Sequence, residues 1–333
     1  MTKKEAGTER VKLDEVLKSL FNVSNKVLIN MLNSLFQENY TTETTEISFT
    51  SNEFVDDEFN ILRGDLFLKL SNQEKSNHYH IELQTLNHDR MVIRMLEYGI
   101  SKAKEIARYE SSQEETIFYI PKQLVIFIEQ NPHIKEELKL RLIFPDGQEV
   151  KYRIPVMKYW EYSKEELLKQ KLYPLLPLQV FNLRYQMEKI KKRKSHSEQE
   201  LRELIQEAQQ IAENISHEAA RLFECREIDG EDLHKILLAN VELFRYLNSR
   251  YIKDEKLNEE VFSMAKTLYD PVVEKRGEKR GEKKGEIKGE KRSKLEIARN
   301  ALVEGIEPHI VVKITGLPME TIQELQAKQE NKS

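Results

Sequence analysis

The sequence predicts a mixed α/β domain followed by a helical region. Apolar residues recur at three- and four-residue steps over 12–38 and again over 88–110, which is the period of an amphipathic helix. Six segments have the alternation or the β-branched content of strands: 41–50, 61–70, 78–86, 121–130, 138–144 and 149–160. The order of one helix, three strands, a second helix and three strands is typical of a mixed sheet flanked by helices.

After about residue 163 the pattern is helical, and no strand is predicted there. Helices are expected at 197–226, 230–249 and 256–268, with Asp229 and Asp254 placed to cap the second and third. The run LYPLLPLQVFNL at 172–183 contains two prolines and predicts irregular packing or short helical turns. We therefore expect a first domain over 1–162 and an α-helical extension over 163–270.

A four-residue repeat, EKRGEKRGEKKGEIKGEKR, follows the helical extension. Glycine at every fourth position weakens a helix, and glutamate at the same period opposes phosphate binding. The repeat therefore favours a charged, weakly helical linker at 271–292 over a nucleic-acid-binding segment.

The last residues, 293–333, predict a small helical module. Helices are expected at 291–304, at 308–315 and from Pro318 onward, and the last two resemble a helix-turn-helix joined through Gly316. Such a hairpin can contact DNA or take part in assembly. Its second helix, METIQELQAK, carries little positive charge, which favours assembly, including self-association of the chain through these helices.

Composition limits the class of protein. The chain has 333 residues, a net charge of −4 and 33% charged residues, so attraction to nucleic acid has to come from local basic patches such as KIKKRK at 189–194. The N-terminus has no apolar stretch typical of a secretory signal, and no apolar run approaches the ~18 residues of a membrane span. A lone Cys225 excludes an internal disulfide framework. These features predict a cytoplasmic protein without a membrane partner.

Two neighbouring predicted strands carry acidic residues on one face. In RGDLFLKL the odd positions include Asp65, and in HYHIELQ the even positions include His80, Glu82 and Gln84. Alternate side chains of a strand point to opposite faces. If 71–77 closes an antiparallel hairpin with residue 82 opposite Asp65, both carboxylates and the amide lie on one side, with Cβ atoms roughly 5–7 Å apart.

Carboxylates this close repel each other unless a positive group lies between them. Mg²⁺ prefers oxygen ligands and binds through one or two carboxylates plus water and substrate phosphate; Mn²⁺ or Ca²⁺ is an alternative. Such an ion lowers the pKa of its bound water, and Gln84 can hydrogen-bond that water but cannot act as an acid or a base. The competing interpretation is an exposed hairpin whose polar face carries no chemistry.

The order of these elements resembles the PD-(D/E)XK nuclease fold and, more narrowly, the recombination-promoting nuclease / putative transposase family. The similar stretches are MLNSLF, RGD, IELQ, RMVIRMLEYGISKAKE and the tail with KITGLPMETI. The resemblance implies a Mg-dependent DNA endonuclease that acts in recombination or in a mobile-element or defence setting. A nuclease-fold protein that binds DNA or assembles without cutting is the alternative. Gly64 stands where the fold's namesake motif has proline.

The resemblance also implies residue roles. Asp65, Glu82 and Gln84 would be catalytic, with Gln84 in the usual place of lysine, and Asp65, Glu82 and the carbonyl of Leu83 would bind the metal. The helix acid that often assists such a site is not obvious, since Glu38 comes late in its helix and Asn33 is nearer the usual position.

Several other residues are candidates for binding. Candidate DNA contacts are Arg63, Arg94, Lys191, Lys192 and Arg193. Arg94 and Tyr98 lie on one helical face, where Arg94 can contact phosphate, order the site or pack against the ring. The basic run at 189–194 can equally be a solvated helix end. His78, His80 and His88 are more simply hydrogen-bonded or exposed histidines than a zinc site, which needs three or four ligands in tetrahedral array.

Overall fold

The structure is a computed structural model that describes most of residues 13–270 and a few residues after 293. The described ranges are 13, 15–49, 53–55, 61–63, 66–73, 75–85, 90–110, 115–193, 198–270, 294, 297–298, 301–302, 307–316, 318 and 321–322, with backbone alone at 53–55, 61–63 and 108–110. The chain divides into two compact units, Met1–Tyr269 and Asp270–Ser333. The sheet and the helical extension therefore belong to the same unit.

The first unit is built on a six-stranded mixed sheet, which confirms the predicted α/β class. Its strands, in their order across the sheet, are β1 (Glu46–Phe49), β4 (Leu66–Ser71), β5 (Ser76–Gln84), β8 (Lys122–Phe127), β10 (Glu149–Lys158) and β9 (Glu137–Ile143). The β5–β8 and β8–β10 pairs are parallel and the other pairs are antiparallel. The predicted turn between β9 and β10 is confirmed, because Gly147 has the positive φ of 86° that glycine tolerates.

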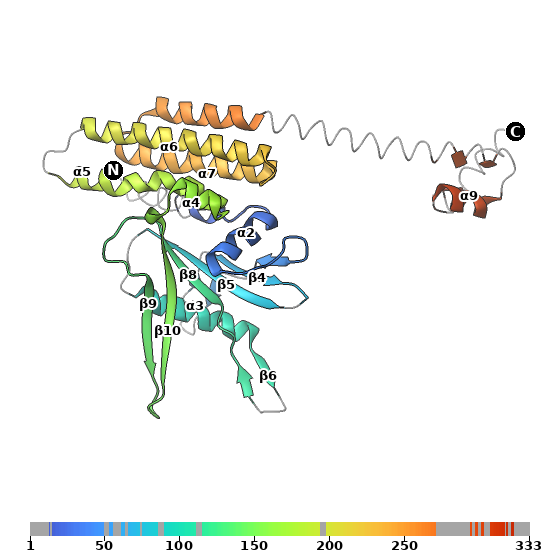
Figure 1. Cartoon of the computed structure of the whole chain (residues 1–333), viewed down its shortest axis with the longest axis horizontal. Helices are drawn as coiled ribbons and strands as arrows, with labels where there is room; N and C mark the ends of the chain where they lie inside the picture. The colour runs from blue at the N-terminus through green and yellow to red at the C-terminus, as the bar shows by residue number, and fades with distance from the viewer. Residues whose placement is uncertain are drawn as a thin grey trace. The chain divides into compact units, whose positions relative to one another are not determined.

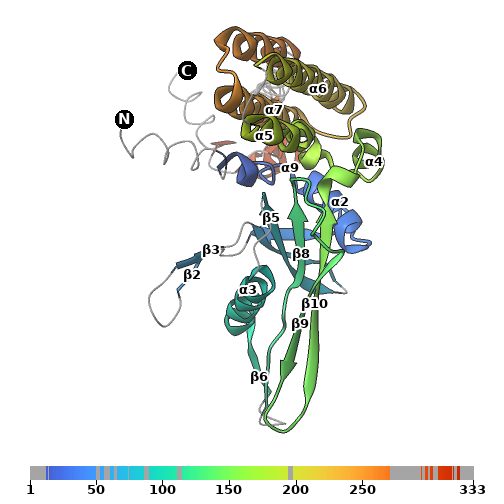
Figure 2. The same cartoon turned by 90° about the vertical axis from the view of Figure 1, so that its left-hand side faces the viewer.

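Two helices cover opposite faces of this sheet (Figure 2). Helix α2 (Asn25–Phe36) packs on the face that carries Tyr79, and its Phe36 ring lies edge-on 4.9 Å from the Tyr79 ring. Helix α3 (Met91–Ile106) packs on the other face, where its buried residues form one apolar core with Phe67 and Val125. Because both faces are covered, strands β4 and β5 are buried on both sides.

Three predicted element boundaries were wrong. The single helix expected over 12–38 is interrupted before α2, because Ser24 adopts an extended conformation and its hydroxyl accepts from the Val27 amide as an N-cap. The strand expected over 61–70 is split into β3 (Ile61–Arg63), which pairs with β2 (Glu53–Val55), and β4. The helix expected to reach 110 ends at Ile106, and β6 (Arg108–Glu110) pairs with β7 (Glu115–Ile117) instead.

The helical extension packs beyond the carboxyl ends of the parallel strands β8 and β10 (Figures 1 and 2). It consists of α4 (Lys164–Lys169), the 3₁₀ segment η2 (Tyr173–Leu183), α5 (Arg184–Lys192), α6 (Glu198–Glu224), α7 (Gly230–Tyr251) and a helix over 255–270. The proline-containing run at η2 is buried and helical in short turns, as expected. Asp229 caps α7, and Asp254 accepts from the Lys256 amide at the start of the next helix, which confirms both predicted caps.

One buried carboxylate joins the sheet domain to the extension. Asp232, in the first turn of α7, is 1% exposed and accepts from the backbone N–H of Ser24 at 2.6 Å and from its hydroxyl at 2.7 Å. Asp232 also accepts from the Asp229 backbone N–H at 3.2 Å, completing a capping box. A single side chain thus connects the N-termini of α2 and α7.

We expect Asp232→Ala to lower the free energy of unfolding by about 2–4 kcal/mol, because it leaves the donors at both helix starts without their acceptor. Urea unfolding followed by circular dichroism measures this loss. Glu231→Ala is the matched control, since Glu231 lies in the same helical turn but its side chain is 65% exposed. Equal stabilities for the two variants would contradict the assigned role of Asp232.

A second buried carboxylate joins the end of α2 to the sheet. Glu38 forms ion pairs with Lys75 and Lys122 and accepts a hydrogen bond from the Tyr79 hydroxyl at 2.9 Å. Burial alone would raise the pKa of the Glu38 carboxyl, but the hydrogen bonds from Lys122, Lys75 and Tyr79 outweigh it and lower the pKa from 4.5 to about 2.

The lowered pKa of Glu38 predicts an acid-sensitive contribution to stability. The folded carboxyl binds its proton less readily than the unfolded one, so the contribution is complete above pH 4.5 and is lost as the pH falls towards 2. We expect Glu38→Gln to lower the free energy of unfolding by about 1–3 kcal/mol at pH 7 and by progressively less below pH 4.5. Thermal melts across this pH range measure the difference, and a difference that is the same at every pH would count against the ion-pair origin.

The second unit contains α9 (Pro308–Thr315), which has the predicted bounds and ends at Gly316 in the left-handed conformation, φ 67°. Ala298, Val311 and Ile322 form its small buried cluster. The predicted linker at 271–292 lies outside the described residues, as do most of the other predicted helical residues of the C-terminal module.

Candidate functional site

The candidate site lies where the second half of β5 faces α3. His80 is fully buried and Glu82 is 2% exposed, and both side chains point to the same sheet face as Phe67 of β4. Met95 and Tyr98 of α3 pack over this face. The interpretation of the hairpin as a solvent-exposed polar surface is therefore wrong at Glu82, because a helix covers it.

Strands β4 and β5 form an antiparallel pair, as predicted. Leu66 pairs with Ile81 at the last described rung of the antiparallel ladder. Asp65 and Gly64 lie outside the described residues. Glu82 and Gln84 come together as predicted, with the Gln84 amide Nε2 donating to Glu82 Oε1 at 3.2 Å.

Arg94 of α3 is the cationic partner of Glu82. Its guanidinium donates to Glu82 Oε1 at 3.0 Å and to the Tyr98 hydroxyl at 3.0 Å, and it lies 5.6 Å from the centroid of the Tyr98 ring. Two of the interpretations of Arg94 are thus combined, since it packs against Tyr98 and also orders the site carboxylate. Its side chain is 33% exposed, so Arg94 connects the buried Glu82 to the surface.

His80 is held neutral beneath this carboxylate. Its ring stacks on Phe67 at 3.9 Å, and its Nδ1 lies 2.9 Å from the Gln123 amide nitrogen, which also donates to the Met95 carbonyl. An amide nitrogen is a donor, so Nδ1 accepts and the ring proton lies on Nε2. Burial is the main cause that lowers the pKa of His80 to about 3, and the positive charge of Arg94 is the second cause.

The donors at this position fit a hard divalent cation better than zinc. Glu82, the Gln84 amide and the Leu83 backbone offer oxygen atoms, the ligand type that Mg²⁺ prefers. His80 Nε2 is buried, has no hydrogen-bond partner among the described residues and lies 3.5 Å from Glu82 Oε2. Because this nitrogen carries the proton, His80 does not itself offer a lone pair to a metal.

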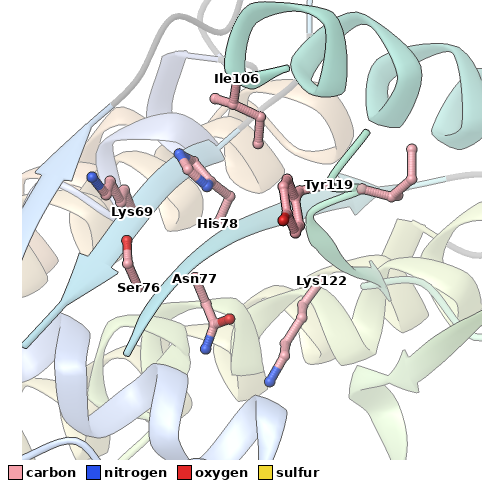
Figure 3. Close-up of a pocket in the computed structure, with 8 residues that line it drawn as sticks. Lys69, Ser76, Asn77, His78, Ile106, Tyr119 and Lys122 are labelled. Carbon is pink, nitrogen blue, oxygen red and sulfur yellow. The ribbon is translucent and has the colours of Figure 1, made fainter. Parts of the chain in front are cut away.

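Among the described residues, no other histidine completes a metal cluster with His80. His88 lies outside the described residues, and His78 lines a separate hollow of about 370 Å³ near the start of β5 (Figure 3). The pKa of His78 is lowered mainly by burial and further by the positive charges of Lys69 and Lys102. Within the described ranges there is no group of three or more His, Cys, Asp or Glu side chains that could hold a metal ion.

Among the described residues, no hydrogen bond or ion pair joins the side chains of the other predicted DNA contacts to Glu82 or Gln84. Arg63 is described by its backbone alone. In the extension, Lys191 donates to the Arg250 carbonyl at 3.2 Å, Arg193 pairs with Glu200 at 3.1 Å, and Lys192 is exposed, which favours a helix end over a phosphate clamp.

The two candidates for the residue that assists the site from the first helix, Glu38 and Asn33, make other contacts. Glu38 faces Tyr79 on the α2 side of the sheet. Asn33 exchanges hydrogen bonds with the backbone of Tyr40, at 2.7 and 2.9 Å, and so shapes the turn after α2.

Two residues that support the site were not predicted. Lys102 is 1% exposed, forms an ion pair with Glu105 and lies 5.5 Å from the Phe67 ring centroid. The sequence pattern that could have indicated Lys102 is its spacing, because residues 94, 98 and 102 are four apart and therefore lie on one face of α3. Gln123, which fixes His80, gave no such signal, because its partners come from other elements.

Comparisons with family models, curated proteins and solved structures found no match. None of the helices in the described part of the chain has the length and apolar character needed to cross a membrane. Functional inference therefore rests on the geometry of the site.

A double-mutant cycle tests the pairing of Arg94 with Glu82. We expect Arg94→Met to lower the free energy of unfolding by about 1–3 kcal/mol, because Glu82 loses its guanidinium partner while remaining buried. The double variant Arg94→Met with Glu82→Gln should lose at least about 1 kcal/mol less than the sum of the losses in the two single variants. Urea unfolding gives all four free energies. The control cycle uses Arg221→Met and Glu218→Gln, an ion pair of 2.7 Å on α6 whose arginine is 56% exposed and whose coupling should stay below about 0.5 kcal/mol. Equal couplings in the two cycles would refute a special role for the buried pair.

Proposed function

We propose that the chain is a metal-dependent endonuclease that hydrolyses DNA phosphodiester bonds. The observation that carries the proposal is the convergence of Glu82, Gln84 and Arg94 at the junction of β5 and α3. Burying a carboxylate is costly, and surrounding it with a cation, an amide and a neutral imidazole is an arrangement typical of functional sites.

The topology supports the same proposal. Helix α2 and strands β1, β4 and β5 are followed by α3 and then by β8, which pairs in parallel with β5. This order resembles the core of PD-(D/E)XK nucleases, in which the acidic residues lie on the two central antiparallel strands. Glu82 lies on β5, one of the two strands concerned, and Asp65 remains the expected second acid.

The residues of the site have separable chemical tasks. A divalent cation held by Glu82, Asp65 and the Leu83 carbonyl would lower the pKa of a water and neutralise charge on the phosphodiester. Arg94 is partly exposed, and its guanidinium can form a charge-assisted hydrogen bond with a phosphate oxygen. Gln84 can orient the attacking water through its amide, but it cannot take up the proton of that water.

One observation favours the second candidate, a nuclease-fold protein that binds DNA or assembles without cutting. The Arg94 guanidinium already neutralises Glu82 Oε1, and Gln84 stands where the related motif carries a lysine. A site of this kind can recognise a phosphate without hydrolysing it. DNA binding without cleavage is the result that this candidate requires.

Nicking of supercoiled plasmid in Mg²⁺ separates the two candidates. We expect wild type to nick the plasmid, EDTA to stop the reaction, and Glu82→Gln and Asp65→Ala to reduce the rate by about a hundredfold or more, because metal binding supplies several kcal/mol of transition-state stabilisation. Glu97→Gln, on the exposed face of α3, is the matched control and should leave the rate unchanged.

The outcomes are distinct. Equal rates for wild type and for both site variants would refute the catalytic assignment. Wild type that binds the plasmid but leaves it uncut in Mg²⁺ and in Mn²⁺ would establish the non-cutting candidate instead.

A further inference from the structure

Strands β9 and β10 form a two-stranded arm that projects from the sheet. β10 pairs with β8 only from Val156 to Lys158, whereas its ladder with β9 runs from Glu149–Ile143 to Pro155–Glu137. In Figures 1 and 2 this ribbon extends past α3, away from the helical extension. The segments 137–143 and 149–155, called the arm below, are therefore the part of the sheet best placed to reach a partner.

One face of the arm carries four basic side chains in two directly opposed pairs. The ladder places Lys151 opposite Arg141 and Arg153 opposite Lys139. All four are exposed, with Lys139, Arg141 and Arg153 at 64%, 63% and 57%. Neighbours along one strand face are about 6.8 Å apart, and directly opposed residues are about 5 Å apart, so the four charges form a compact patch.

This arrangement is unfavourable for the isolated chain. Like charges directly opposite each other destabilise a strand pair. Glu137 lies 2.7 Å from Lys139 and 3.8 Å from Arg153, and Glu149 lies 3.7 Å from Arg141, but Lys151 has no ion pair with any described residue. The two acids and four bases on this face leave it with a net charge of +2.

Protection of a sheet edge does not explain the pattern. Lysine on an edge strand prevents pairing with other chains, and Lys139 alone on β9 would serve that purpose. Edge protection does not require like charges to face each other across two strands, where they repel. A polyanion placed on this face would remove the repulsion.

We propose that the arm binds the phosphate backbone of double-stranded DNA through Lys139, Arg141, Lys151 and Arg153. A duplex carries one negative charge per about 1.7 Å of its axis, so several phosphates come within reach of a patch of this size. A two-stranded ribbon also fits the major groove, which is about 12 Å wide. The protruding position lets the arm contact the duplex without moving the core of the sheet.

In this proposal the arm contributes to the affinity for DNA and takes no part in the hydrolysis. Val156 of β10 pairs with Val125, which packs under α3, so even-numbered residues of β10 face α3 and odd-numbered residues face away. Lys151 and Arg153 therefore project from the sheet face opposite Glu82. The choice of DNA as ligand rests on the proposed function, and the arm would hold DNA that flanks the point of cleavage.

Binding in EDTA tests the arm separately from cleavage. We expect Arg141→Gln with Lys151→Gln, in the full chain, to weaken binding of a fluorescein-labelled duplex about tenfold and to reduce the slope of log K against log salt by about two, because each substitution removes one cation that neutralises a phosphate. Lys235→Gln with Lys256→Gln removes the same charge from the helical extension and should change neither quantity. Thermal melting should show that the arm variant is at least as stable as wild type, because repulsion has been removed.

The outcomes distinguish this proposal from the nuclease itself. If wild type binds the duplex and the arm variant binds it equally tightly with the same salt slope, the arm proposal is overturned, whatever the plasmid assay shows. Wild type that does not bind the duplex in EDTA overturns it as well. In an active nuclease, the arm variant should raise KM and leave kcat unchanged, whereas Glu82→Gln should lower kcat.

Discussion

The constraint on which the rest of the site depends is the burial of one carboxylate between β5 and α3. An ionised group removed from water requires compensation, and Glu82 receives it from the Arg94 guanidinium and the Gln84 amide. His80 remains neutral beside it, which avoids a second buried charge. These requirements explain why α3 carries polar residues on the helix face that packs on the sheet.

The two faces of the sheet are used differently. The α3 face contains the polar network around His80 and Glu82. The α2 face is apolar where Phe36 packs on Tyr79, and its charges lie at the starts of β5 and β8, where Glu38 pairs with Lys75 and Lys122. The helical extension is attached to the sheet domain at more than one place. Asp232 binds the N-terminus of α2, and Arg184 of α5 forms an ion pair with Glu129, which follows β8.

Much of the fold could be predicted because its signals are local. Strand alternation located β5 and its neighbours, proline and glycine located the β9–β10 turn, and the caps at Asp229 and Asp254 followed from helix chemistry. The errors arose where a tertiary partner decided the outcome. Ser24 interrupts an otherwise helical pattern while it is hydrogen-bonded to Asp232, a residue 208 positions away in the chain.

The sequence by itself determined that Glu82 and Gln84 share a strand face, because alternation along a strand is a property of the backbone. It also placed Arg94 and Tyr98 on one side of a helix, because the helical period is fixed. The tertiary structure alone decided that this strand face is buried and that Arg94 is the partner of Glu82. Gln123 likewise fixes the proton of His80 only through the fold, since burial and pairing between distant segments depend on how the elements pack.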